Sequence, residues 1–402
     1  MGEEGEGVIK IDSKIIELLG KLEEIELEDV DLEIGDLEIW IQPGVAPPRV
    51  EVAPKKVEEK PKKLIEVEFQ APIMEYPGEI VEVKLGATKG EGGTRAKSFV
   101  IGGEKAPAFY NFESKMPHPP VISFDVFDMK IPLAKAVKMH VMDVMEDPAE
   151  WAKRSVEKFG AEMINLHLVS IDPLLKDTPP QQAVKTVEEV LQAVDVPIAV
   201  GGCGDPLKDL KVFEKVAEAT EGERILFNSV TLDMDIEKMA KVINKYGHVV
   251  IAFTSMDMAH AKELNRKLYP FLPKDRIVID TTTAALGYGL DYAFTIMERT
   301  RLGGLMGDPE LQHPMSSGTT NAWAAREAWM REDRIGPEWG PRELRGPIWE
   351  VVTALTLLLA GVDYFMMMHP AAVQTLKKII KDLLGNGGVK TDRVENWVSV
   401  KI

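Results

Sequence analysis

The stretch Val121-Ile122-Ser123-Phe124-Asp125-Val126-Phe127 is a short run of mainly apolar residues, and an amphipathic helical pattern follows it. The same unit, a strand and then a helix, repeats eight times up to Leu384. This alternation predicts a closed (β/α)8 TIM barrel of the α/β class, with any binding face at the carboxyl ends of the strands. We expect its strands at residues 121–127, 163–169, 196–200, 224–229, 249–253, 276–280, 311–316 and 363–368, the seventh having the weakest pattern.

Three of the intervening helices have clear start signals. Residues 148–159 follow Asp147 and residues 236–246 follow Asp235, and Asp is a favoured residue just before a helix because its carboxylate accepts the free backbone N–H groups. A third helix is predicted at residues 179–194, which open on two prolines.

The barrel, residues 121–384, is one of five predicted regions. Residues 1–42 form an acidic extension, residues 43–63 a Pro/Lys/Glu-rich linker, and residues 385–402 a C-terminal tail. In the extension a helix is expected at 9–22, and 24–41 alternates apolar and acidic residues. That alternation fits a solvated tail or a segment that pairs with a neighbouring subunit. Residues 64–120 are strand-rich, with strands expected at 64–69, 79–84, 98–101 and 108–112, and suit antiparallel hairpins that cap the bottom of the barrel.

Composition excludes several classes of protein. The 402 residues are 45% hydrophobic and carry a formal charge of −17, of which −11 lies in residues 1–39. No basic stripe suggests nucleic acid or an anionic membrane. The longest apolar stretch, around residues 351–361, is too short to span a bilayer, and the first residues lack a secretory pattern. We therefore expect a cytoplasmic protein. The single Cys203 allows no disulfide within the chain and no cysteine-ligated metal cluster.

Polar residues occur where the first two predicted strands should face the barrel interior. Asn165 and His167 share one face of the second strand, and Ser123 and Asp125 share one face of the first. An inward histidine is more often a satisfied core residue than a metal ligand. No second histidine lies at ligand spacing from His167, so we predict no metal site.

Two further strand ends are unusual in composition. Asp280-Thr281-Thr282-Thr283 ends the sixth predicted strand, and its hydroxyls are either hydrogen-bonding groups for a ligand or a cap for the next helix. Met366-Met367-Met368-His369 ends the eighth, and its thioethers suit either packing against a flat ligand or an ordinary buried strand end.

Two glycine-rich segments carry weaker signals. Residues 86–95 lack the Gly-Lys-Ser/Thr of a phosphate loop and precede no helix, so a mobile hairpin tip is the better interpretation. Cys203, in Gly201-Gly202-Cys203-Gly204-Asp205, has no activating base nearby and is predicted to pack.

Ordinary barrel catalysis is disfavoured by what the predicted strands lack. None of them contains the lysine that Schiff-base chemistry requires, and the seven histidines are scattered along the chain. The strand ends instead offer amides, hydroxyls and thioethers. This chemistry favours a face that covers a ligand over one that cleaves a substrate.

Several segments together resemble a known family. They are Ser98–Glu104 continuing to Phe112-Glu113, Asp147–Ala152, Gly201–Asp205, Asp280–Thr283 with Gly287–Gly289, Asn321–Trp329, and Gly361–Pro370. As a set, covering about residues 64–384, they resemble the small (delta) subunits of the acetyl-CoA decarbonylase/synthase complex. They are also similar to the small subunit of the bacterial corrinoid iron–sulfur protein. The acidic extension favours the archaeal form.

The resemblance implies a non-catalytic subunit that pairs with a larger gamma subunit. Gamma would hold the iron–sulfur cluster and most contacts to a corrinoid, which carries a methyl group between a tetrahydropterin methyltransferase step and acetyl-CoA. The delta chain would shield the corrinoid, hold no cluster of its own and help maintain the complex. The Asp-x-His-x-x-Gly corrinoid loop is absent here, since Asp257 and His260 have the wrong spacing.

From their positions at strand ends, and not from a family motif, we predict a set of corrinoid-contacting residues. They are Asn165, His167, Asn228, Ser229, Thr281, Thr282, Thr283, Met368 and His369. The alternative is a stand-alone methyltransferase barrel that binds a pterin through Asp125, Asn165 and Asp280.

Overall fold

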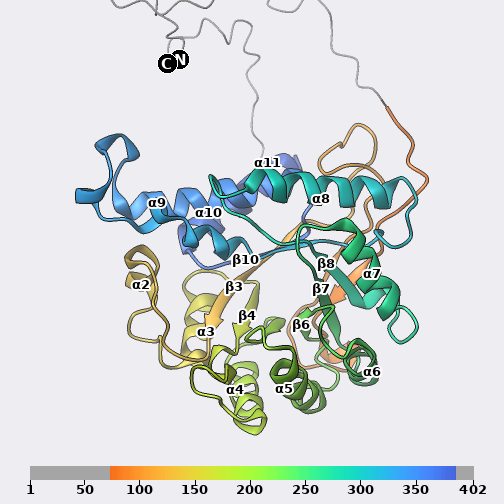
Figure 1. Ribbon diagram of the computed structural model, residues 1–402, viewed down its shortest axis with the longest axis horizontal. Coiled ribbons are helices and arrows are strands. Elements are labelled where there is room, and N and C mark those ends of the chain that lie inside the picture. Colours follow the sequence, from red (N-terminus) through yellow and green to blue (C-terminus); the bar gives the residue numbers. More distant parts are fainter. Residues whose placement is uncertain (1–72, 386–402) are drawn as a thin grey trace, which may run out of the picture. The chain divides into compact units, whose positions relative to one another are not determined.

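The computed structural model describes residues 73–385, and Figure 1 shows its parallel strands surrounded by helices. The strands follow the order β8-β7-β6-β5-β4-β3-β10-β9. A parallel bridge between Ile279 and Met315 joins β8 to the residue before β9 and closes the barrel. The barrel strands are β3 (Val121–Phe127), β4 (Met163–His167), β5 (Ile198–Gly201), β6 (Leu226–Val230), β7 (Val249–Phe253), β8 (Ile277–Asp280), β9 (Ser316–Ser317) and β10 (Tyr364–Met367).

Eight helices cover the barrel, each following its strand. Two shorter ones, α2 and α9, lie inside the connections after β3 and β9 (Figure 1). Asp147 and Asp235 accept backbone N–H groups at the starts of α3 and α6, as predicted. The helices are α2 (Lys135–Val141), α3 (Pro148–Glu157), α4 (Pro180–Ala193), α5 (Pro206–Ala219), α6 (Ile236–Tyr246), α7 (Met258–Leu268), α8 (Leu290–Leu305), α9 (Arg326–Trp329), α10 (Arg342–Leu359) and α11 (Pro370–Leu383).

The closed barrel predicted from the sequence is confirmed, and most strand boundaries agree within two residues. The seventh strand is the exception, because β9 has only two residues where six were predicted. The backbone N–H of Met315 donates to the Asp363 side chain at 2.7 Å. Residues 312–315 make only separate backbone hydrogen bonds, such as that from the Tyr364 N–H to the Met315 carbonyl at 3.1 Å, and Ser316 and Ser317 alone pair in register with β10.

A two-stranded hairpin caps the bottom of the barrel, as expected. β1 (Val83–Leu85) pairs antiparallel with β2 (Phe99–Ile101). The buried side chains of Val83, Leu85 and Ile101 pack against residues at the amino ends of the barrel strands. The predicted strand at 108–112 is wrong, because this segment forms turns in which Phe109 has a positive φ of 63°.

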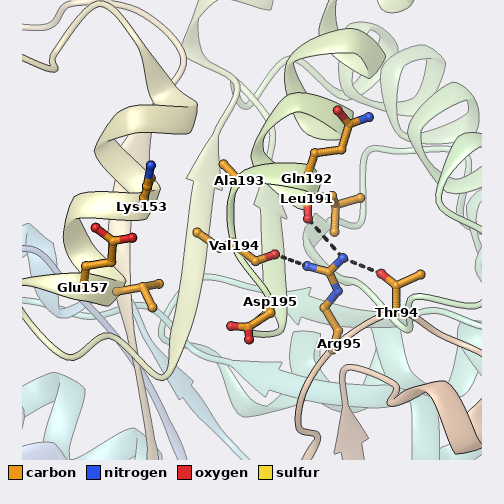
Figure 2. A pocket seen from close by; sticks show the side chains of 10 residues that line it. Thr94, Arg95, Lys153, Glu157, Leu191, Gln192, Ala193, Val194 and Asp195 are labelled. Carbon is orange, nitrogen blue, oxygen red and sulfur yellow. Dashed lines mark hydrogen bonds between the residues drawn. The ribbon is translucent and has the colours of Figure 1, made fainter.

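The link between β1 and β2 is anchored, in contrast to the predicted mobile tip. Arg95, only 6% exposed, donates to Glu223 at 2.8 Å. It also donates to the carbonyls of Val194 and Leu191 at 2.6 and 3.1 Å (Figure 2). These bonds lie beside a cavity of about 440 Å³. The guanidinium is occupied by the protein itself, so it is a structural anchor. The exposed residues 89–91 are also tied down, because the Glu91 carboxylate accepts from the Thr88 N–H at 2.9 Å and from Lys84.

The predicted elements at 9–22, 24–41, 43–63 and 64–69, and the tail after residue 385, lie outside the described residues. The division of the chain into five regions stays a prediction. Among the helices that are described, none is long and apolar enough to cross a membrane.

Candidate functional site

The carboxyl ends of β3 and β4 meet at a buried carboxylate. Asp125, 2% exposed, accepts a hydrogen bond from the Asn165 amide Nδ2 at 2.8 Å and another from the hydroxyl of Thr320. His167 Nε2 lies 3.1 Å from the same Asp125 oxygen, Oδ1. The register of the parallel strands β3 and β4 places Asp125 directly opposite Asn165. The inward direction predicted for these side chains is therefore what assembles the cluster.

His167 lies at the outer edge of this cluster and is half-buried. Its ring stacks on Phe127, with centroids 4.8 Å apart and planes 14° from parallel. Its Nε2 is 2.8 Å from Asn165 Nδ2. Gly201, on β5, leaves room for the imidazole, because a Cβ there would be 3.2 Å from His167 Nδ1.

Asn228 and Ser229 occupy the end of β6 and are both half-buried. The Asn228 amide donates to the sulfur of Met366 at 3.2 Å, a weak acceptor that leaves the amide oxygen free to interact with a ligand. The Ser229 hydroxyl makes no hydrogen bond with the described residues. These two residues thus present unused polar groups on the side of the mouth next to β7.

The three predicted threonines point in different directions. Thr281 is 1% exposed with its hydroxyl buried, and Thr283 bonds to Ser317 at 2.9 Å, so neither faces the open mouth. Thr282 is half-buried, has a positive φ of 77° and donates to the carbonyl of Thr254 at 2.8 Å. Positive φ is unfavourable for a β-branched residue, and surrounding structure must hold it.

Asp280 provides part of that support. One of its oxygens accepts from the Thr282 N–H at 2.9 Å and the other from the Ser316 hydroxyl at 2.9 Å. Burial outweighs these bonds and raises the pKa of Asp280 to about 6.

Met368 and His369 are held by a residue that the sequence interpretation missed. Glu350 on α10 is fully buried and accepts their backbone N–H groups at 2.7 and 3.2 Å. Burial raises the pKa of Glu350 to about 8. The available signal was a single acid inside the apolar run Ile348–Val352.

The imidazole of His369 is neutral at physiological pH. Burial, with a smaller contribution from the charge of His140, lowers the pKa of His369 to about 4. Its ring stacks on Trp323 at 5.8 Å and meets His140 edge-on at 5.1 Å. Met368 is 9% exposed and His369 6% exposed, so both contribute little open surface.

One short helical segment joins the two sides of the mouth. In the 3-10 turn Thr319–Ala324, Thr320 donates to Asp125 and the Asn321 amide donates to the Thr283 carbonyl at 3.1 Å. The structure thereby connects the β3–β4 cluster with the threonine segment. No local sequence pattern indicates this link, because the partners are up to 195 residues apart.

The described barrel strands lack the groups that several kinds of barrel catalysis use. The barrel strands β3 to β10 contain no lysine, and residues 73–385 include no group of three or more side chains suited to hold a metal ion. Cys203 bonds to Asp209 at 3.2 Å, and burial raises the pKa of its thiol to about 12. The fold and site define a (β/α)8-barrel protein whose mouth is built from amides, hydroxyls, thioethers and neutral imidazole.

Within that class the chain belongs to the family described as the CO dehydrogenase/acetyl-CoA synthase delta subunit, whose model matches residues 82–335. This confirms the resemblance found in the sequence. The delta subunit of the acetyl-CoA decarbonylase/synthase complex from Archaeoglobus fulgidus is 58% identical over 331 residues, covering 81% of this chain and 73% of the relative. Subunit delta 1 from Methanosarcina thermophila is 55% identical, covering 83% and 77%.

Among solved structures, a dihydropteroate synthase from Stenotrophomonas maltophilia is similar, with a TM-score of 0.46 and 14% sequence identity. The match covers 68% of this chain and 95% of that one. Similarity at this level supports no statement about ligand or reaction.

Proposed function

We propose that this delta-family subunit pairs with the corrinoid-carrying gamma subunit of its complex, in the cytoplasm, and shields the corrinoid with its barrel mouth. The corrinoid's cobalt would supply the atom that carries the methyl group, and gamma would hold most of the cofactor and the iron–sulfur cluster. This chain would be non-catalytic alone and would help maintain the quaternary structure. The observation that carries the proposal is the combination of a mouth rich in amides, hydroxyls and thioethers with an apolar rim.

The rim consists of large apolar side chains that are exposed at the end of strand β7 (Phe253), on the strand-to-helix connections or on the first helical turns after them. Leu174 is 91% exposed, and the others are between 37% and 72% exposed. In a barrel of this kind these connections all lie on the same face as the mouth. A cluster of exposed apolar residues around a polar centre is typical of a protein-binding surface. The rim residues are Met139, Met142, Leu174, Leu175, Leu207, Phe253, Tyr288 and Trp329.

The mouth residues fit a ligand with a neutral polar edge. Asn228 and Ser229 have unused hydrogen-bonding groups, and the raised pKa of Glu350 keeps its carboxyl protonated at neutral pH. The carboxylate of Asp125 is covered by donors from its own chain. A corrinoid has carboxamide side chains around an apolar ring, so amides and soft apolar groups are suitable partners for it.

The pterin-binding alternative has weaker support. It requires Asp125 and Asp280 to accept hydrogen bonds from a pterin. Both oxygens of each carboxylate already accept hydrogen bonds within the chain.

The test is to co-express this chain with its gamma subunit and corrinoid, purify the pair and measure the dissociation constant. Met142→Glu introduces a charge at the rim, and Met306→Glu is the matched control. Their exposures are 66% and 61%, and Met306 lies at the opposite end of the barrel. We expect Met142→Glu to weaken pairing at least about tenfold, because burying an unpaired charge is costly, and Met306→Glu to leave it unchanged.

Equal effects of the two substitutions would contradict the placement of the interface. Transfer of a methyl group from methyl-tetrahydropterin to free cobalamin by the purified chain alone would replace the proposal with the pterin-binding alternative.

A further inference from the structure

We propose that His167 presents its Nδ1–H as a hydrogen-bond donor at the mouth, so that it binds an oxygen acceptor of the ligand and does not coordinate a metal. The identity of the ligand rests on the proposed function. The state of the imidazole does not, because it follows from contacts within this chain.

The first step is the orientation of the Asn165 amide. The atom 2.8 Å from the Asp125 carboxylate oxygen must be the amide nitrogen, because an amide oxygen there would repel the carboxylate. Asn165 is fully buried and cannot exchange this contact for water. Asp125, itself held by Thr320, therefore fixes Nδ2 of Asn165 toward the interior of the cluster.

The second step is the role of His167 Nε2. The same Asn165 Nδ2 is 2.8 Å from Nε2 in hydrogen-bonding geometry. Since Asn165 Nδ2 can only donate, Nε2 must accept, and it therefore carries no proton. Nε2 also lies 3.1 Å from Asp125 Oδ1, and these two atoms would form an ion pair only if the imidazole were protonated. A neutral imidazole with a bare Nε2 has its proton on Nδ1.

The third step is the accessibility of that proton. The imidazole is fixed by its stacking on Phe127, and its side chain is 23% exposed. Nδ1 lies on the side of Gly201, where a Cβ would come within 3.2 Å of it, so the glycine keeps a side chain from covering this nitrogen. Nδ1 makes no hydrogen bond with the residues that the structure describes. His167 is thus a rigid N–H donor that a ligand can reach.

These contacts define the ligand chemistry. A metal requires a nitrogen lone pair, which Nδ1 does not offer. A carboxamide oxygen on the edge of a corrin ring is a suitable acceptor. His167 would accordingly be a positioning residue that selects the orientation of the ring.

The imidazole state is tested by NMR of the full chain with ¹⁵N-labelled histidine at pH 8, with the His167→Gln variant identifying the resonances among seven histidines. We expect a protonated, pyrrole-type Nδ1 and a pyridine-type Nε2. Asn165→Leu removes the donor to Nε2, and the proton is expected to move to Nε2 beside Asp125. A pyridine-type Nδ1 in the unmodified chain would overturn the inference without bearing on subunit pairing.

The ligand role is tested in the heterodimer loaded with cobalamin. His167→Phe keeps the stacking on Phe127 but loses the donor, and it should accelerate cobalamin release about three- to tenfold, the effect of one neutral hydrogen bond. The cobalt absorption and EPR spectra should not change. Altered cobalt spectra would show direct ligation and refute the inference, and unchanged release would refute the ligand role. Failure of the loaded heterodimer to form at all would instead refute the proposed function.

Discussion

Replacing Asp280 with Asn should stabilise the protein, by an amount that grows with pH. Asp280 is fully buried, and its pKa is raised to about 6. The substitution keeps the shape of the side chain. The amide oxygen can still accept from the Thr282 N–H, and the amide nitrogen can donate to the Ser316 hydroxyl, which now donates to Asp280.

The magnitude follows from proton linkage. In the unfolded chain an Asp titrates near about 3.9, so the folded state binds the proton more tightly. Stability from this group is present at low pH and is lost as the pH rises from about 4 through about 6. A difference of roughly two pKa units corresponds to about 3 kcal/mol at pH 7 but only about 0.5 kcal/mol at pH 4. The difference in unfolding free energy between Asp280→Asn and the unmodified chain should therefore grow by about 2 kcal/mol over this range.

The assay is urea denaturation of both proteins at pH 4, 5.5 and 7. Comparing the variant with the unmodified chain cancels the titration of distant groups. Glu298→Gln, at an exposed position of α8, is the control and should show no such trend. A constant difference across these pH values would refute the reasoning, because it would mean that Asp280 does not retain its proton in the folded state.

Two further predictions concern other parts of the molecule. Arg95→Met leaves the Glu223 carboxylate buried without its cation and should lower the free energy of unfolding by about 3–5 kcal/mol. Arg331→Met breaks the exposed ion pair with Asp333 and should lower the free energy of unfolding by less than about 1 kcal/mol in the same urea denaturation assay. With a pKa of about 12, Cys203 should react with iodoacetamide at pH 8 roughly a thousandfold more slowly than an ordinary thiol, and fast alkylation of the folded protein would contradict this.

The parts of the fold that the sequence predicted are those with a local periodic signal. β3 and α6 have the predicted boundaries, because both are regular apolar patterns with clear ends. β9 could not be predicted in the same way. Its two serines have no apolar alternation. They are placed by β10 and by the hydrogen bond that the preceding residue, Met315, donates from its N–H to the Asp363 side chain.

The candidate site shows the same division between local and distant information. The inward direction of Asn165 follows from strand alternation, and its contact with Asp125 follows from adjacent strands. Thr320 and Glu350 reach the mouth through tertiary packing across long sequence separations, and no local pattern specifies that. Thr281 is among the residues predicted to contact the corrinoid only because it adjoins Thr282. The sequence cannot show that its hydroxyl is buried.

The buried carboxyl groups have different partners at the two ends of the barrel. At the hairpin end, the carboxylates are paired with arginines. Arg301 bonds to Glu104 at 2.7 Å and to Asp363 at 2.6 Å, with all three side chains buried. These pairs hold the cap onto the strands, and burial still raises the pKa of Asp363 well above its ordinary value although the Arg301 charge lowers it.

At the mouth, Asp280 and Glu350 have no arginine or lysine within ion-pair distance among residues 73–385, and only N–H and O–H groups support them. Without a cation the cost of burial is met by proton uptake, which explains why the pKa of Asp280 is about 6 and that of Glu350 about 8. His369 is neutral for the same reason, since burial lowers the pKa of its imidazole. A face that holds acids without counter-ions, and keeps the carboxyl of Glu350 protonated at neutral pH, is suited to cover a ligand by shape and hydrogen bonds. It offers little attraction to phosphates or other strongly charged substrates.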